Sequence, residues 1–153
     1  MTGNIIGTAQ FGYLRKVYRM AWLRDTIDEK INGLDCVLAF ETASDYLGTN
    51  KMSYRPSVCI YAKEDPHREG VDCTVVDSFD NMDIVEVRGV RCTSERQTLF
   101  DLLRNDRDSQ VTVEAVADWY FRHNESFEGL DVPDDIRDIF DSYVDDAIHY
   151  YDC

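Results

Sequence analysis

Basic residues are scarce in this chain. Its 16 lysines and arginines stand against 30 aspartates and glutamates, which leaves a formal net charge of −14. Proteins that bind nucleic acids need clustered lysine and arginine, and phosphate groups repel a surface this acidic. We therefore expect no direct contact with nucleic acid or with a membrane. A basic protein surface, by contrast, is attracted over roughly 8 Å at physiological salt.

Long apolar runs and paired cysteine motifs are absent as well. No stretch approaches the roughly 18 consecutive apolar residues of a membrane span. Near the N-terminus the basic side chains follow the apolar ones, which is not the layout of a signal peptide. The cysteines are odd in number and without C-x-x-C spacing, namely Cys36, Cys59, Cys73, Cys92 and Cys153. These features predict a cytoplasmic protein with reduced thiols.

Catalytic motifs are missing too. The chain has no G-x-S-x-G, H-E-x-x-H, phosphate loop or G-x-G-x-x-G, and its histidines, His67, His123 and His149, share no motif. We expect no enzyme activity, no catalytic residues, no cofactor and no metal. Three weaker alternatives remain open. They are a zinc site from Cys59, His67 and Cys73, calcium binding near the sequences DNMD and DVPDD, and a small enzyme with an unrecognised site.

What is present indicates one domain with a sizeable core. The length of 153 residues and the hydrophobic content of 44% suit a single unit spanning residues 1–153. Alternation and β-branched residues predict short strands at Ser57–Ala62, Val71–Val76, Ile84–Val87 and Val90–Cys92, the first two joined as a hairpin by Lys63–Gly70. We expect an α+β fold, in which a small mixed or antiparallel sheet packs with about five helices.

Helical periodicity predicts the remaining elements. A basic helix at 10–30, within an N-terminal segment 1–35, has Phe11, Leu14, Val17, Tyr18, Ala21, Trp22 and Ile27 apolar and Arg15, Lys16, Arg19 and Arg24 outside. A helix within 36–50 ends at Gly48 in a left-handed cap. Ser94 and Gln97 form a capping box before the core stripe Leu99, Leu102 and Leu103. Another helix spans 111–124, with Val113, Val116, Ala117, Tyr120 and Phe121 inward.

The negative charge is concentrated in the last third of the chain. Residues 1–104 carry 16 acidic and 13 basic side chains, whereas residues 105–153 carry 14 and 3, a net of −11. A final helix begins near Pro133 and buries Ile136, Ile139, Phe140, Tyr143, Val144, Ala147 and Tyr151. The aspartates of this segment fall mostly on the other side, and we expect them to form an acidic face that binds a partner. They are Asp131, Asp134, Asp135, Asp138, Asp141, Asp145 and Asp146. The alternative is an ordinary solvated helix face.

Two motifs resemble the AbiEi-type antitoxins of type IV toxin–antitoxin systems. Those proteins carry a segment similar to SHETALYLHGL and, after strands, G-(I/L)-R-V-T-S-P-E-R-T-L-x-D-L-L-R. The positions that match here are Glu41, Thr42, Ala43, Tyr46, Leu47, Gly48, Gly89, Val90, Arg91, Thr93, Ser94, Thr98, Leu99, Asp101, Leu102, Leu103 and Arg104. This chain departs from the pattern at Glu95, Arg96 and Gln97, and the family's DNA-binding winged helix is not visible.

The resemblance covers about residues 36–122 and implies a toxin-neutralising domain, with 131–153 as an acidic terminal helix. It leads us to expect a non-catalytic inhibitor that binds a basic protein, either a toxin or a nucleic-acid-binding effector. The main alternative is an anti-CRISPR-type nucleic-acid mimic that occupies the DNA channel of an effector nuclease. The missing winged helix and the concentration of charge both favour this alternative. The identity of the target and the oligomeric state are left open by the sequence.

Overall fold

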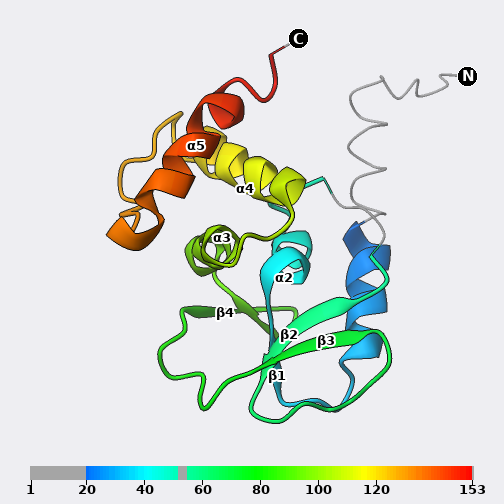
Figure 1. The fold of residues 1–153 in the computed structure, drawn as a ribbon. Coiled ribbons are helices and arrows are strands. Elements are labelled where there is room, and N and C mark those ends of the chain that lie inside the picture. The colour runs from blue at the N-terminus through cyan, green and yellow to red at the C-terminus, as the bar shows by residue number, and fades with distance from the viewer. Residues whose placement is uncertain (1–19, 52–54, 153) are drawn as a thin grey trace, which may run out of the picture.

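The computed structural model describes residues 20–51 and 55–152 (Figure 1). An N-terminal helix occupies residues 20–30. It is followed by β1 (Cys36–Leu38), α2 (Phe40–Leu47), β2 (Val58–Ala62), β3 (Val71–Val75), β4 (Ile84–Val87), β5 (Val90–Thr93), α3 (Glu95–Arg104), α4 (Ser109–Arg122), a 3-10 turn η1 (Asp134–Ile136) and α5 (Arg137–Ile148). These elements form one α+β unit with a mixed sheet, as the sequence predicts. The predictions for residues 1–19, which include the part 10–19 of the basic helix, lie outside the described residues.

The sheet is built around β1, which lies at the start of the stretch 36–50 that was predicted to be helical. The strand order is β3-β2-β1-β5-β4, with β1 antiparallel to β2 and parallel to β5. All three residues of β1 are buried. Val37 contributes to one apolar cluster, and its neighbours Cys36 and Leu38 contribute to the other. A strand covered on both faces has no polar side to alternate with, so its pattern is lost in a short apolar run.

The predicted hairpin between β2 and β3 is wrong, because these two strands run parallel. The connection 63–70 carries the chain back to the start of β2. The Val58 amide there donates to the carbonyl of Gly70 at 2.8 Å, and the Val76 amide donates to Ala62 at 2.9 Å at the other end. The antiparallel hairpin in the described chain is β4–β5. Its two turn residues, Arg88 and Gly89, both have positive φ, as a tight two-residue hairpin turn requires.

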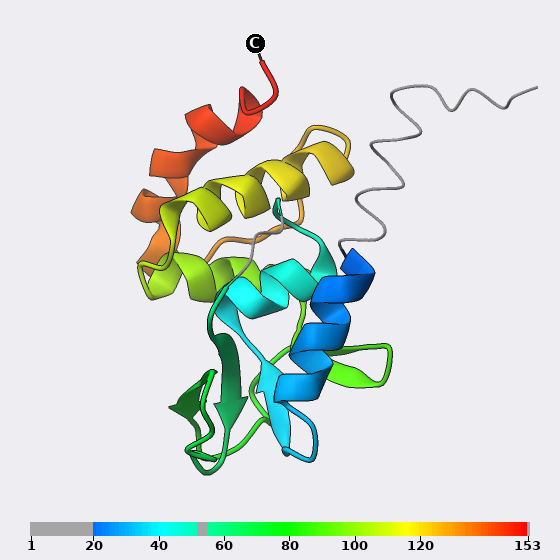
Figure 2. The same cartoon turned by 90° about the vertical axis from the view of Figure 1, so that its right-hand side faces the viewer.

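Helices cover both faces of the sheet. The helix at 20–30 lies against one face (Figure 2) and buries Leu23 and Ile27 there. On the other face α3, α4 and α5 contribute to the second cluster, and α4 packs between α3 and α5. Trp22, expected on the apolar side, is 57% exposed. The inward register of this helix therefore runs through Leu23 and Ile27, because a one-residue offset rotates a side chain by about 100°.

Local sequence chemistry accounts for two helix ends. Gly48 ends α2 with φ +78°, the left-handed cap that was predicted. The Ser94 hydroxyl accepts from the Gln97 amide at 3.1 Å, which is one half of the predicted capping box. The other half is wrong, because the Ser94 amide donates instead to the carbonyl of Asp83. The Gln97 side chain accepts from the Asp83 amide, so it ties α3 to the segment before β4.

Among residues 20–51 and 55–152, no helix has both the length and the apolar character that crossing a membrane requires.

The central position of β1 can be tested with a matched pair of valines. Val37 in β1 is fully buried, whereas Val75 in the edge strand β3 is 56% exposed. We expect Val37→Ala to lower the free energy of unfolding by about 2 kcal/mol, because it leaves a cavity on a face that cannot collapse. Val75→Ala removes the same atoms and should change stability by less than about 0.5 kcal/mol. Urea denaturation followed by circular dichroism measures both, and equal losses would contradict the placement of β1.

Candidate functional site

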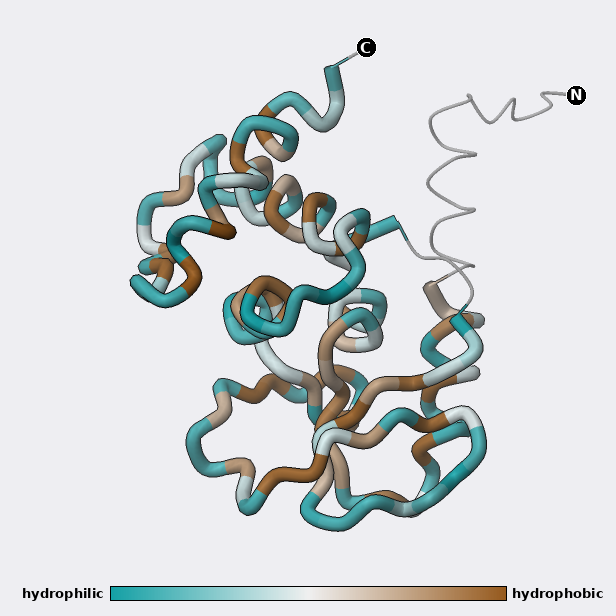
Figure 3. Tube along the Cα trace, in the orientation of Figure 1, coloured by the Kyte–Doolittle hydropathy of each residue, from teal (hydrophilic) through white to brown (hydrophobic). Residues whose placement is uncertain are grey.

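All seven aspartates of the predicted partner-binding surface are exposed. Asp131 lies in the loop before η1, Asp134 and Asp135 lie in η1, and the other four lie on α5. The inward side of this segment is apolar, with Ile136, Phe140 and Ala147 each at most 3% exposed. In Figure 3 this C-terminal segment alternates between hydrophobic and hydrophilic residues. We call the seven aspartates the acidic face.

The rest of the protein neutralises little of the acidic face. Within the described residues, only Asp135 has a lysine or arginine at salt-bridge distance. The Arg104 guanidinium donates to its two oxygens at 2.8 and 3.2 Å and holds the pKa of that carboxyl below its usual range. Asp145 lies 3.5 Å from the imidazole of His149, which carries charge only when protonated. Most of the acidic face therefore keeps its charge available to a partner.

Two of the three basic residues of the last third are engaged elsewhere. Arg107 pairs with Glu41 in α2. Arg122 pairs with Asp118 and reaches Glu95 at 3.8 Å. The third, Arg137, is exposed at the start of α5, where it donates to the carbonyl of Val132 and keeps its positive charge. It offsets part of the negative charge at that end of the acidic face.

Two of these charges also oppose the helix that carries them. Asp145 and Asp146 lie in the last turn of α5, where no basic residue is present. The C-terminal end of a helix carries partial negative charge, which disfavours a carboxylate there. Asp141 and Asp145, four residues apart, add a like-charge repulsion. Helix stability alone does not select this arrangement.

Most positions of the antitoxin-like motifs serve the interior of the fold. Arg107 Nε lies 2.9 and 3.0 Å from the two carboxylate oxygens of Glu41, and its guanidinium carbon lies 4.3 Å from the centre of the Phe40 ring. The Thr42 hydroxyl accepts from the Cys59 amide at 2.8 Å. Phe40 adopts φ +50° at the turn from β1 into α2, a conformation that costs roughly 1 kcal/mol or more. The contact with Arg107 helps to hold this turn.

The second motif is bonded internally in the same way. The hydroxyls of Thr93 and Thr98 lie 2.6 Å apart, and both residues are buried. Asp101 accepts from the Tyr61 hydroxyl and from the Gln97 side-chain amide, each at 3.0 Å. The motif residues therefore lock α2 and α3 to the sheet rather than face a partner.

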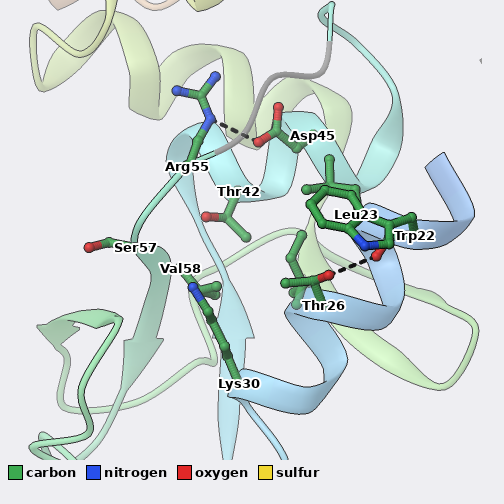
Figure 4. Close-up of a pocket in the computed structure, with 10 residues that line it drawn as sticks. Trp22, Leu23, Thr26, Lys30, Thr42, Asp45, Arg55, Ser57 and Val58 are labelled. Atoms are coloured by element: carbon green, nitrogen blue, oxygen red, sulfur yellow. Dashed lines mark hydrogen bonds and ion pairs between the residues drawn. The ribbon is translucent and has the colours of Figure 1, made fainter. Parts of the chain in front are cut away.

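The pocket drawn in Figure 4 lies between the N-terminal helix and α2. Its cavity volume is about 20 Å³, room for about one water molecule. Asp45 and Arg55 lie at its polar end, with Arg55 Nε donating to a carboxylate oxygen of Asp45 at 2.8 Å. Burial raises the pKa of Asp45 despite this pair. A pocket of this size with no histidine or cysteine in its lining does not suit a small-molecule substrate.

A wider hollow of about 420 Å³ opens beside the last residue of β2, Ala62. Acidic side chains line it, Asp35, Glu64 and Asp65, together with Lys63. Asp35 is already paired with Arg91, and Asp65 accepts from the amide of His67. The hollow brings together no nucleophile with a base.

The structure does not assemble the metal sites considered from the sequence. Cys59 belongs to the cluster on one face of the sheet, whereas Cys73 packs against the cluster on the other, so the two thiols cannot share a zinc ion with the exposed His67. Among the described residues, no group of three histidine, cysteine, aspartate or glutamate side chains is placed to hold a metal. The four described cysteines are unpaired, and burial raises the pKa of Cys36 to about 11 and that of Cys92 to about 12. Such thiols are protonated and unreactive at neutral pH.

Two aromatic side chains that were predicted to face inward lie at the surface. Phe121, at the end of α4, is 36% exposed, and Tyr151, after α5, is 63% exposed. Tyr143 and Tyr150 are partly buried against the core. Tyr151 was predicted from a helical stripe, but α5 ends at Ile148, so the inward register no longer applies to it. Phe121 still belongs to α4 and lies in its last turn, where the buried side of the helix runs through Val116, Ala117 and Trp119 instead.

No family model and no curated protein matches this chain. The likeness to AbiEi-type antitoxins accordingly remains an expectation drawn from the two motifs.

The pair between Glu41 and Arg107 should matter for stability. Glu41 is 8% exposed, so Arg107→Met leaves a buried carboxylate without its cation. We expect a loss of about 3 kcal/mol in the free energy of unfolding. Glu41→Gln should cost less, since its amide oxygen still accepts from Arg107, whose side chain is 32% exposed. Urea denaturation of both single variants and the double variant gives the coupling, and two equal, additive losses would exclude the proposed asymmetry.

Asp101 gives a prediction for pH. Burial raises its pKa even though Gln97 and Tyr61 donate to it. The folded state therefore binds this proton more readily than the unfolded state, and the contribution of Asp101 to stability rises as pH falls toward the raised pKa. Relative to Asp101→Asn, the wild type should gain stability as the pH is lowered from about 7 toward the ordinary carboxyl pKa of about 3.9. Chemical denaturation at several pH values across this range tests this, and a relative loss on acidification would refute it.

Proposed function

We propose that this protein is a non-catalytic inhibitor, of the antitoxin type, that binds a basic macromolecular partner through the acidic face. The observation that carries the proposal is the arrangement of charge on η1 and α5. Seven aspartates are exposed there, and one of them is paired with an arginine within the described residues. The opposite side of the same segment is buried in the core.

The electrostatics of the acidic face favour a protein partner. Net charge and field sign steer association and suppress partners of the wrong charge. A nucleic acid or an anionic membrane carries the same sign as this surface. A toxin or nuclease with a lysine- and arginine-lined groove carries the opposite sign and matches it.

Within this class, the anti-CRISPR-type nucleic-acid mimic differs from the antitoxin in what it competes with. A mimic occupies the groove that holds DNA, so partner and DNA exclude each other. An antitoxin lifts the growth arrest caused by its toxin when the two are co-expressed. The antitoxin-like motif residues have internal roles, which fit a scaffold that either kind of inhibitor could use.

The rival proposal, an enzyme with an unrecognised site, has less support. The small cavity has no histidine or cysteine in its lining. In the larger hollow, Asp35 is already paired with Arg91, and the acidic residues Glu64 and Asp65 are exposed. Neither of these two hollows in the described part of the chain brings a nucleophile next to a base.

The acidic face can be tested by changing Asp134, Asp138, Asp141 and Asp145 together to asparagine. We expect the dominant partner captured from source-cell lysate by the wild type to be lost, and its Kd, measured by calorimetry, to rise at least about tenfold. The affinity of the wild type should also fall with rising salt, because the contact is ionic.

A matched control removes four charges from the other end of the molecule. Glu64→Gln, Asp72→Asn, Asp77→Asn and Asp80→Asn all alter exposed residues in or near the loops flanking β3. This variant should bind with near wild-type affinity. If both variants bind the partner equally weakly, the loss of affinity reflects net charge alone and the acidic face has no specific role. If the affinity of the wild type does not change with salt, the proposed electrostatic contact is excluded.

A further inference from the structure

The exposed rings of Phe121 and Tyr151 form a pair. Their centroids lie 5.2 Å apart in an edge-to-face arrangement. Phe121 closes α4, and Tyr151 follows α5 by three residues, so the pair joins the exposed ends of two packed helices. Large aromatic side chains at a surface are typical of the centre of protein interfaces.

The pair is held in place by partners that lead into the core. The ring of Tyr150 lies 5.1 Å from that of Tyr151, and its hydroxyl donates to Glu114 at 3.0 Å. On the other side, Tyr120 contacts Phe121 at 5.0 Å, and a chain of ring contacts continues through Phe127 to the buried Phe140. A preorganised anchor loses little entropy when it binds.

Three exposed aspartates lie near Tyr151 in the sequence: Asp152 is adjacent to it, and Asp145 and Asp146 lie in the last turn of α5. Two cations are also close, because Arg122 follows Phe121 and pairs with Asp118, and the Lys51 ammonium lies 5.2 Å from the centre of the Tyr150 ring. The aromatic pair therefore lies at the C-terminal end of the acidic face. The negative face of an aromatic ring attracts a cation, and more so when carboxylates lie nearby.

We propose that the Phe121–Tyr151 pair is the anchor of the docking surface and that it seats an arginine side chain of the basic partner. The guanidinium stacks on the Tyr151 ring while Asp145, Asp146 and Asp152 supply the opposite charge. This inference rests on the proposed function and adds to it the chemistry of the contact. A basic segment rich in arginine is the occupant, because arginine combines a cation with a planar face that stacks on aromatic rings.

A second copy of the chain does not fit this surface. Each copy carries a net charge of −14, and an interface centred on this pair would bring carboxylates of both copies together. The charge complementarity that favours a basic partner disfavours self-association.

The test uses a hexa-arginine peptide, with the uncharged isostere hexa-citrulline as its control, titrated into the full-length protein at low salt and followed by NMR. We expect the largest shifts at Phe121 and Tyr151, and a Kd for Tyr151→Leu that is about two- to fivefold above the wild-type value. Trp22→Leu alters an equally exposed aromatic on the N-terminal helix and should leave the Kd unchanged. Amide spectra of each variant report whether it is folded.

The outcomes separate this inference from the proposed function. If the Asp134/Asp138/Asp141/Asp145 amide variant loses binding and Tyr151→Leu does not, the acidic face stands and the aromatic anchor is overturned. If hexa-citrulline binds as well as hexa-arginine, the cationic contact is overturned. If sedimentation shows a wild-type dimer that Tyr151→Leu abolishes, the pair is a self-association contact instead. Unchanged binding in both variants overturns both proposals.

Discussion

β1 is three residues long, yet both of its faces lie under apolar side chains and both of its edges are hydrogen-bonded to neighbouring strands. Val37 packs toward α3 and α4, and Leu38 packs toward the N-terminal helix. The two cores of the protein therefore meet at this strand. The sharp turn at Phe40 follows directly, because the chain must leave the sheet and begin α2 within two residues.

The ion pair between Glu41 and Arg107 extends this constraint to the outer helices. Arg107 lies in the connection between α3 and α4, and its contact with α2 fixes where α4 begins. α4 in turn supports α5, so α5 is separated from the sheet by other helices. The packing of an outermost helix requires apolar residues on its inner side only. Its outer side can therefore carry the exposed aspartates of the acidic face without disturbing the core.

Charge and aromatic surface come together at one end of this outer layer. In the interaction that we propose, the aspartates of α5 supply long-range attraction and the Phe121–Tyr151 pair supplies an apolar contact at short range. Interfaces commonly combine a desolvated aromatic centre with a charged rim. Several buried polar groups, by contrast, are bonded to one another and serve the interior, as Asp101 is to Tyr61 and Thr93 is to Thr98.

Local patterns in the sequence determined much of this protein. The core stripe of α3, the left-handed end of α2 at Gly48 and the exposure of the acidic face all follow from helical periodicity and residue chemistry within a few positions. The tertiary structure decided the rest, because the deciding contacts join residues far apart in the chain. Whether Cys36–Leu38 is a strand depends on partners at least 22 residues away in the sequence. The loop between β2 and β3 resembles a hairpin turn in sequence, so it gives no sign that these two strands pair in parallel. Phe121 and Tyr151 meet only because α4 and α5 pack together.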